Sequence, residues 1–228
     1  MRVSGSKRAI EWVIWAAGAR ANIPRHPQDQ LSVERDAAML FINEARGGGL
    51  GPGKDVKRVV MISACVCRKK VAGWWPEGGE ERVLWKKMKE TIMPTYVEAK
   101  TEVDELLVSE CRVNLRRQCQ RQDTSEKGEE EEAQDEEEGC FSAVSIRPSG
   151  LSEEPGTGKV QLGRTRWGMN PLSRDDLAEV VVELCETPGR KGVGGGVGCR
   201  WLDVGPGDEG IHTAVERCIV EDVDTSEL

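Results

Sequence analysis

The sequence predicts an α/β fold, a doubly wound parallel sheet with helices on both faces. Apolar segments of strand length alternate with segments whose apolar residues recur at helical spacing, an order typical of parallel sheets. The first two strand segments are continuously apolar rather than alternating, which suits burial on both faces. With 228 residues, 38% of them hydrophobic, we expect a single domain over residues 1–228.

The first predicted strand is Trp12–Ala17, an apolar run followed by Gly18. Its last residues are small, so a ligand or another backbone could approach closely there. A helix is predicted for Leu31–Ala45, where apolar residues recur at helical spacing, and the glycines at 47–49 end it.

The second predicted strand is Lys57–Ser63, and Ser63 stands at its C-terminal end, where open α/β sheets bind ligands. A glycine cluster, Gly47–Gly53, precedes this strand. A dinucleotide fingerprint must follow a strand and open a helix, whereas this cluster follows a helix. We therefore interpret it as a helix-to-strand connection.

Two helices are predicted next, at Glu80–Met93 and Pro94–Leu107. The second carries Lys100 and Tyr96, the only tyrosine of the chain. Positions i and i+4 share a helix face, so the ammonium is expected to lower the tyrosine pKa from its usual value of about 10. A general acid/base working near neutral pH needs such a shift. The alternative is an ordinary amphipathic helix with a half-buried tyrosine and a solvated lysine.

The acidic excess of the chain comes from one stretch. Eight residues between Glu129 and Glu138 are acidic, and without them acidic and basic residues are equal at 32 each. The surrounding residues 112–140 are charged and glutamine-rich, a composition that cannot bury enough surface to order itself. We expect a disordered or loosely helical surface insertion at about 112–140, acting as a solvated spacer.

The C-terminal part continues the alternation of strands and helices. The predicted strands span 141–147, 160–162 and 201–204, and the predicted helices span 173–186 and 211–221. Ser173 begins the first of these helices with a capping signal. The stretch Glu154–Lys159 resembles a phosphate-binding P-loop but lacks the required glycine at 153 and the required serine or threonine at 160.

Composition argues against several other classes of function. The chain shows no clustered basic residues for nucleic acid, no apolar run of membrane-spanning length and no secretory signal. The eight cysteines lack Cys-x-x-Cys spacing, and the two histidines, His26 and His212, lie far apart and are taken as structural or solvated. We expect neither a metal site nor a disulfide framework, but reduced, mostly buried thiols in a cytoplasmic protein.

In order and spacing, six segments of the chain match the short-chain dehydrogenase/reductase superfamily. The chain resembles in particular its atypical, NmrA-like members with an NAD(P)-binding domain, including uncharacterised fungal ones. The matching segments are Val13–Gly18, Asp36–Ala38 with its helix, Lys57–Ser63, Tyr96–Lys100, Arg147–Leu151 leading into Glu154–Lys159, and Ser173–Ala178.

The resemblance implies a Rossmann sheet that binds NAD or NADP across the carboxyl ends of its strands. It implies that Tyr96 is the catalytic acid/base, that Lys100 lowers its pKa and binds the nicotinamide ribose, and that Ser63 assists the tyrosine. In many relatives the assisting hydroxyl comes one or two residues later, where this chain has Ala64 and Cys65. The residues that the resemblance places along the cofactor are Ala16, Ala17, Gly18, Lys100, Arg147, Pro148, Ser149 and Gly150.

The chain also departs from the superfamily pattern. The superfamily opens with a strand, a glycine-rich turn and a helix that cradle the pyrophosphate, and only the residues before Trp12 precede the strand that should be the fourth. We therefore expect a partial Rossmann domain, truncated at its N-terminal side, whose first strand presents an apolar edge. Three hypotheses stay open: an NAD(P)-dependent oxidoreductase acting on a small carbonyl substrate, a non-catalytic dinucleotide-binding or sensing protein, and an inactive truncated fragment.

Overall fold

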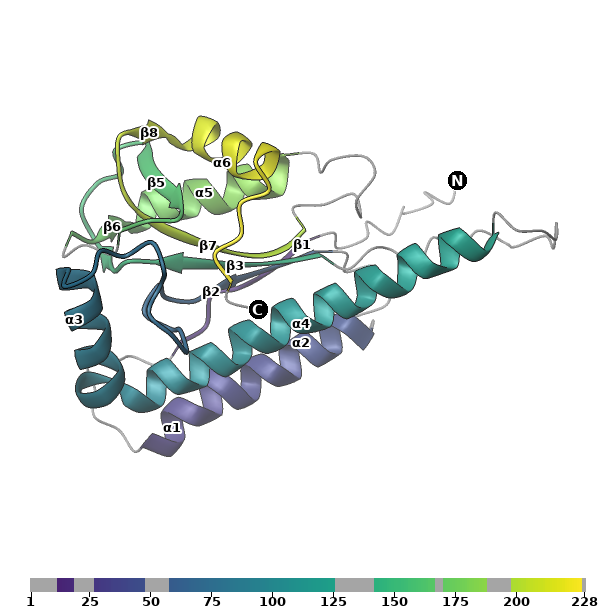
Figure 1. Ribbon diagram of the computed structural model, residues 1–228, viewed down its shortest axis with the longest axis horizontal. Coiled ribbons are helices and arrows are strands. Elements are labelled where there is room, and N and C mark those ends of the chain that lie inside the picture. The colour runs from purple at the N-terminus through teal and green to yellow at the C-terminus, as the bar shows by residue number, and fades with distance from the viewer. Residues whose placement is uncertain are drawn as a thin grey trace, which may run out of the picture.

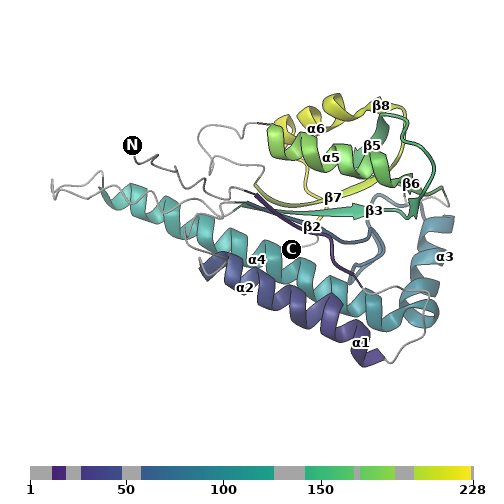
Figure 2. The ribbon, with the colours of Figure 1, turned by 180° about the vertical axis from the view of Figure 1, so that it is seen from behind.

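A computed structural model describes residues 12–18, 27–47, 58–125, 142–166, 170–187 and 198–226. These residues form three layers, with a sheet in the middle (Figure 1). The helices α1 (Pro27–Leu31), α2 (Ala38–Gly47) and α4 (Pro94–Ser125) lie on one side of the sheet. The helices α5 (Arg174–Glu186) and α6 (Ile211–Val220) lie on the other side, as the reverse view in Figure 2 also shows. The predicted α/β class is confirmed.

The main sheet has six strands in the order β1-β2-β3-β7-β5-β8. Their bounds are β1 Trp12–Trp15, β2 Arg58–Ile62, β3 Ser142–Pro148, β7 Cys199–Pro206, β5 Lys159–Gly163 and β8 Glu209–Gly210. The first four are parallel, whereas β5 pairs antiparallel with both β7 and β8. The sheet is thus mostly parallel, and the strand predicted at 160–162 adds an antiparallel extension. Two short strands, β4 (Leu151–Ser152) and β6 (Leu172–Ser173), form a separate parallel pair.

The first strand, β1, lies at an edge of the main sheet. Among the described residues it pairs only with β2, so no described strand covers its outer edge. Ile14 is about half exposed there, while Trp15 packs against Phe41 of α2 with ring centroids 4.8 Å apart.

Two predicted helices each contain a π-helical segment. The helix predicted at 31–45 is observed as α1, the π-segment η1 (Ser32–Ala37) and α2. The helix predicted at 80–93 is observed as α3 (Glu80–Lys87) followed by the π-segment η2 (Met88–Ile92). Such π-turns are rare and often accompany functional sites, because they change which residues face the neighbouring element. The segment η1 directs Glu34 into the interior.

The core is divided into two main clusters by the sheet. One cluster joins α2 and α4 to β2 and includes Ile42, Met61 and Leu107, all fully buried. The other joins α5 and α6 to β3, β5 and β7 and includes Leu184 and Leu202. Because both faces of the central strands are covered, β3 is buried at every position, including its polar residues Ser142, Ser145 and Arg147.

Helix α4 continues well beyond its predicted end at Leu107. It runs to Ser125, so residues 112–125, expected to belong to the insertion, are helical, whereas 126–141 lie outside the described residues. The extension is anchored at its start by fully buried Cys111 and by Arg112, which binds Asp224 at 2.6 Å. Composition cannot reveal these tertiary contacts. Although α4 has 32 residues, none of the helices described is long and apolar enough to cross a membrane.

A disulfide joins Cys111 of α4 to Cys199 at the start of β7. The expectation of reduced thiols was therefore wrong for this pair. The two cysteines are 88 residues apart in sequence, and they meet only because α4 crosses the sheet beside β7. Four other described cysteines, Cys65, Cys67, Cys185 and Cys218, are free, as expected.

The P-loop-like stretch Glu154–Lys159 is a loop that binds a side chain of the protein itself. The backbone N–H groups of Thr157 and Gly158 both donate to Asp176 Oδ1 at 2.8 Å. Asp176 lies in the first turn of α5, which the predicted cap Ser173 begins by accepting a hydrogen bond from the Asp175 N–H. The capping prediction is confirmed. The backbone N–H groups of this loop bind the Asp176 carboxylate, where those of a P-loop would bind a phosphate.

Candidate functional site

The residues predicted for the site come from elements that meet at the carboxyl edge of the parallel strands. Tyr96 and Lys100 lie on the first turns of α4, and Ser63 directly follows β2. Lys100 Nζ donates to the Ile62 carbonyl oxygen at 3.3 Å, which ties α4 to the end of β2. The carboxyl edge of an open α/β sheet is where such folds bind ligands.

Lys100 forms a buried ion pair that the sequence did not reveal. Its Nζ lies 2.8 Å from Glu34 Oε2, and both side chains are almost completely buried. Glu34 shares the inward face of its helix with Ala38 and Ile42, four and eight residues later, both buried. In the sequence, the signal was a glutamate that occupies a position of the apolar, inward-facing spacing, and this signal could have identified Glu34 as a buried residue.

Tyr96 is half-buried, and its environment favours the neutral phenol. Burial raises the pKa of Tyr96 well above its usual value of 10, and negative charge at Cys67, Glu34, Asp104 and Cys65 adds to the shift. The lowering that the sequence predicted from Lys100 is not found. The main physical reason is the burial of the phenol, and the negative charge of Glu34, which lies against the Lys100 ammonium, adds to it.

Ser63 is engaged in a buried hydrogen-bond cluster beneath the site. Its hydroxyl donates to Asp104 Oδ2 at 2.6 Å, and the Ser145 hydroxyl donates to Asp104 Oδ1 at 2.7 Å. Burial raises the pKa of Asp104, although Arg147 and both serines oppose the shift. Asp104 is four residues beyond Lys100, so Tyr96, Lys100 and Asp104 form one row along α4.

Arg147, which the resemblance places along the cofactor, is completely buried in this structure. Its guanidinium lies 4.0 Å from the ring centroid of Trp201 and within 4 Å of Asp104 and Asp203. It also donates to the Cys67 carbonyl oxygen. Arg147 therefore acts as an internal cation here, and its expected contact with a nicotinamide stays a prediction.

The other predicted cofactor residues differ in exposure. Ala16, Ala17 and Gly18, which follow β1, are exposed. At the end of β3, Pro148 is buried, whereas the next two residues, Ser149 and Gly150, are half-exposed. These exposed and half-exposed residues leave the carboxyl edge of the sheet accessible at both strand ends, and their contact with a dinucleotide stays a prediction. For the pyrophosphate half, the described residues contain no strand followed by a glycine-rich turn and a helix.

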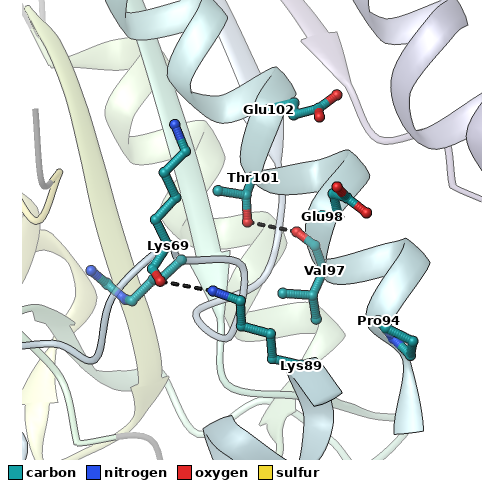
Figure 3. A pocket seen from close by; sticks show the side chains of 8 residues that line it. Lys69, Lys89, Pro94, Val97, Glu98, Thr101 and Glu102 are labelled. Atoms are coloured by element: carbon teal, nitrogen blue, oxygen red, sulfur yellow. Dashed lines mark hydrogen bonds between the residues drawn. The ribbon is translucent and has the colours of Figure 1, made fainter. Parts of the chain in front are cut away.

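A separate cavity of about 360 Å³ lies on another face of α4. Val97, Glu98 and Thr101 line it, together with Lys69 and Lys89, and Figure 3 shows Lys89 reaching the Lys69 carbonyl oxygen at 2.8 Å. Consecutive helix positions are about 100° apart, so these residues turn away from the row that contains Tyr96 and Lys100. Lys69 already pairs with Glu105 at 2.5 Å. We therefore do not assign this cavity to the candidate site.

No known family model matches the chain, and no curated protein sequence matches it. Solved structures do match. One is a putative NAD-dependent epimerase/dehydratase from Bacillus halodurans, with 22% identity and a TM-score of 0.55 over 91% of this chain and 70% of that one. Another is the oxidoreductase ylbE from Lactococcus lactis, with 18% identity and a TM-score of 0.57 over 94% of this chain and 69% of that one. The chain therefore shares the Rossmann-like fold of these two solved structures.

Proposed function

We propose that the chain is an NAD(P)-dependent oxidoreductase of the short-chain dehydrogenase/reductase superfamily, of the NmrA-like kind, acting on a small carbonyl substrate. The observation that carries the proposal is the placement of Tyr96 and Lys100 on successive turns of α4, with Lys100 bound to the end of β2. This places a phenol and an ammonium at the carboxyl edge of a Rossmann-like sheet. The fold shared with a putative NAD-dependent epimerase/dehydratase and with an oxidoreductase supports the choice of cofactor.

In the proposed reaction the reduced nicotinamide supplies a hydride. Tyr96 donates its phenolic proton to the carbonyl oxygen as negative charge develops there. Lys100 is held at the strand end by Glu34 and the Ile62 carbonyl, and the family resemblance assigns its ammonium to the nicotinamide ribose. The buried cluster around Asp104 supports α4 from below and keeps this row of side chains in place.

A thermal-shift titration with NADPH and NADH tests cofactor binding. A ligand that binds only the folded chain stabilises it by about 2.7 kcal/mol at a concentration 100 times its Kd. We expect the melting temperature to rise with one or both dinucleotides but not with AMP, which lacks the nicotinamide half. No rise at millimolar NADPH or NADH would reject the proposal and favour a chain without independent activity.

A second candidate function is dinucleotide binding without turnover, as in a sensing protein. The observation that favours it is the internal engagement of Ser63 and Arg147, since both are bound to other protein groups in this structure. The two candidates differ in one measurement. Stabilisation by NADPH combined with constant absorbance at 340 nm across a panel of small aldehydes and ketones would support the sensing protein over the enzyme.

A further inference from the structure

The cavity beside α4 that lies outside the candidate site has the size of a ligand site. Its volume of about 360 Å³ is within the range of about 300–1,000 Å³ that is usual for small-molecule sites. It lies between the first turns of α4, the residues that follow β2 and the π-segment η2. Lys69, which lines it, is 64% exposed, so the cavity is reachable from solvent.

One wall of this cavity is apolar. It is formed by Pro94 at the start of α4 and by Val97, which is almost completely buried. The Thr101 hydroxyl donates to the Val97 carbonyl oxygen at 2.6 Å and is thus engaged within the helix. Figure 3 shows the side chains of Val97 and Thr101 pointing toward Lys69 and Lys89. This wall suits the hydrocarbon part of a ligand, because burial of apolar surface is favourable.

The opposite wall carries a cation that is held in place but not neutralised. Lys89 Nζ donates to the Lys69 carbonyl oxygen at 2.8 Å and lies 4.9 Å from the centroid of the Trp85 ring. Among the described residues Lys89 forms no ion pair, whereas Lys69 and Arg68, the other cations of the lining, are each paired with a carboxylate. An ammonium has three N–H donors, so two are left for a ligand.

Two carboxylates also line the cavity, but they do not balance the charge of Lys89. Figure 3 shows the carboxylates of Glu98 and Glu102 pointing away from Lys69 and Lys89. Glu102 lies instead 3.9 Å from Arg35 Nη1. The cavity therefore has a positive side and an apolar side.

We propose that this cavity binds a small monocarboxylate with a hydrophobic body, such as an aromatic or branched-chain acid. Its carboxylate accepts charge-assisted hydrogen bonds from Lys89, and its hydrocarbon part packs against Val97 and Thr101. An amine is repelled by the ammonium, and a dianion such as phosphate finds a single uncompensated cation among the described residues of the lining. The site is separate from Tyr96 and Lys100, which lie on another face of α4.

Benzoate is the probe, and ligand-observed proton NMR measures its Kd. We expect benzoate to bind the wild-type chain with a Kd in the millimolar range or below, as is usual for ligands of this size. Benzyl alcohol lacks the charge, acetate lacks the ring and benzylamine reverses the charge, so each should bind about tenfold more weakly or worse. No binding of millimolar benzoate, or equal binding of benzylamine, would overturn the proposal.

Lys89→Met tests the anchor, because it keeps the apolar stem and removes the ammonium. We expect the Kd of benzoate to rise about tenfold or more. Lys89→Arg restores a cation and should bind benzoate more tightly than Lys89→Met. The matched control is Lys87→Met, which removes an exposed lysine at the end of α3 that does not line the cavity, and its Kd should equal that of the wild-type chain. An unchanged Kd in folded Lys89→Met, or an equal loss in Lys87→Met, would contradict the role of Lys89.

Nuclear Overhauser effects between the benzoate ring protons and the Thr101 methyl group locate the ligand. Thr101→Ser removes this methyl group and keeps the hydroxyl, so it assigns the signal. We expect the effect in the wild-type chain and its loss in Thr101→Ser. Effects confined to other methyl groups would place benzoate elsewhere and overturn the proposal. None of these measurements uses a dinucleotide, so a failure of NADPH to stabilise the chain would reject the proposed function and leave this site standing.

Discussion

Ser63 donates a hydrogen bond of 2.6 Å to the buried carboxylate of Asp104. Ser145 donates a bond of 2.7 Å to the other oxygen of the same carboxylate, so the two serines are equivalent partners of Asp104. They differ in place, because Ser63 follows β2 at the edge of the candidate site and Ser145 lies in the middle of β3. Comparing variants of Ser63 and Ser145 can therefore distinguish a structural role from a catalytic role.

Ser63→Ala and Ser145→Ala should destabilise the chain by similar amounts, about 1–3 kcal/mol each, since each removes one hydrogen bond to a buried charged group. Urea unfolding measures this cost. If Ser63 also assists Tyr96, only Ser63→Ala should reduce the turnover of a carbonyl substrate. Equal turnover in the two variants would limit Ser63 to supporting Asp104.

Tyr96→Phe should abolish proton donation while keeping the shape of the side chain. We expect kcat to fall by about 10²–10⁴-fold, the usual contribution of general acid/base catalysis. The melting-temperature rise with NADPH should persist, because the phenol is not required for binding. Steady-state kinetics at 340 nm measures the loss, and unchanged kcat would exclude Tyr96 as the acid.

Asp203→Asn should be among the most destabilising single substitutions. Asp203 forms an ion pair with Arg68 and lies 3.7 Å from Arg147, and all three side chains are fully buried. Removing the negative charge leaves buried guanidinium groups uncompensated, which typically costs about 3–5 kcal/mol. The free energy of unfolding from urea titration measures the effect.

A matched control for that variant is Glu153→Gln. Glu153 pairs with Arg174 at 2.7 Å, but the two side chains are 83% and 57% exposed. Exposed ion pairs contribute about 0–1 kcal/mol, so this variant should unfold at nearly the wild-type urea concentration. Equal losses in the two variants would contradict the internal role of Asp203.

His212 provides a pH-dependent contribution to stability. The hydrogen bond to Glu183, at 2.6 Å, raises the pKa of His212 above its usual value of 6.5. A raised folded-state pKa means that the contribution is complete below about pH 6.5 and is lost as the pH rises through the folded-state pKa. Stability relative to Glu183→Gln should therefore be greater at pH 5.5 than at pH 8.5.

Proton NMR of the imidazole signals measures this pKa directly. The chain has two histidines, so His212→Gln assigns the signals without ambiguity. In Glu183→Gln the His212 pKa should return towards its usual value. A titration midpoint that is identical in Glu183→Gln and the wild-type chain would show that the contact is absent in solution.

The disulfide between Cys111 and Cys199 should stabilise the fold by restricting the unfolded chain. Loss of a disulfide typically costs about 2–4 kcal/mol, and we expect this cost for Cys199→Ser in non-reducing buffer. Cys185→Ser, at a free and half-buried thiol, is the control and should change stability much less. Alkylation followed by mass mapping of the native, unreduced chain provides the direct test, and modification of both Cys111 and Cys199 would contradict the bond.

Local patterns predicted most of the elements, and long-range contacts account for what they missed. The apolar runs at 12–17 and 57–63 and the cap at Ser173 are signals contained within a few residues, and all three correspond to observed features. The antiparallel direction of β5 depends on its pairing with β7, which no local pattern encodes. The extension of α4 depends on Arg112 meeting Asp224 near the other end of the chain.

The same distinction applies to the candidate site. The spacing of Tyr96 and Lys100 predicted that they share a helix face, and the structure places them on successive turns of α4. The predicted lowering of the Tyr96 pKa was wrong because burial of the phenol raises this pKa, and the carboxylate of Glu34, which lies against Lys100, adds to the rise. Charge compensation between distant segments requires the three-dimensional arrangement.

The row of side chains along α4 makes the length of this helix a constraint in its own right. Tyr96, Lys100 and Asp104 follow one another at intervals of four residues, and Cys111 is bonded to β7 farther along. Deleting one residue between Lys100 and Asp104 would turn everything beyond it by about 100° and shift it by about 1.5 Å. Either the hydrogen bond between Ser63 and Asp104 or the disulfide between Cys111 and Cys199 would then be lost. Substitutions within this stretch can be accommodated one side chain at a time, but an insertion or deletion would displace Tyr96 and the hydrogen bonds of Asp104 relative to each other.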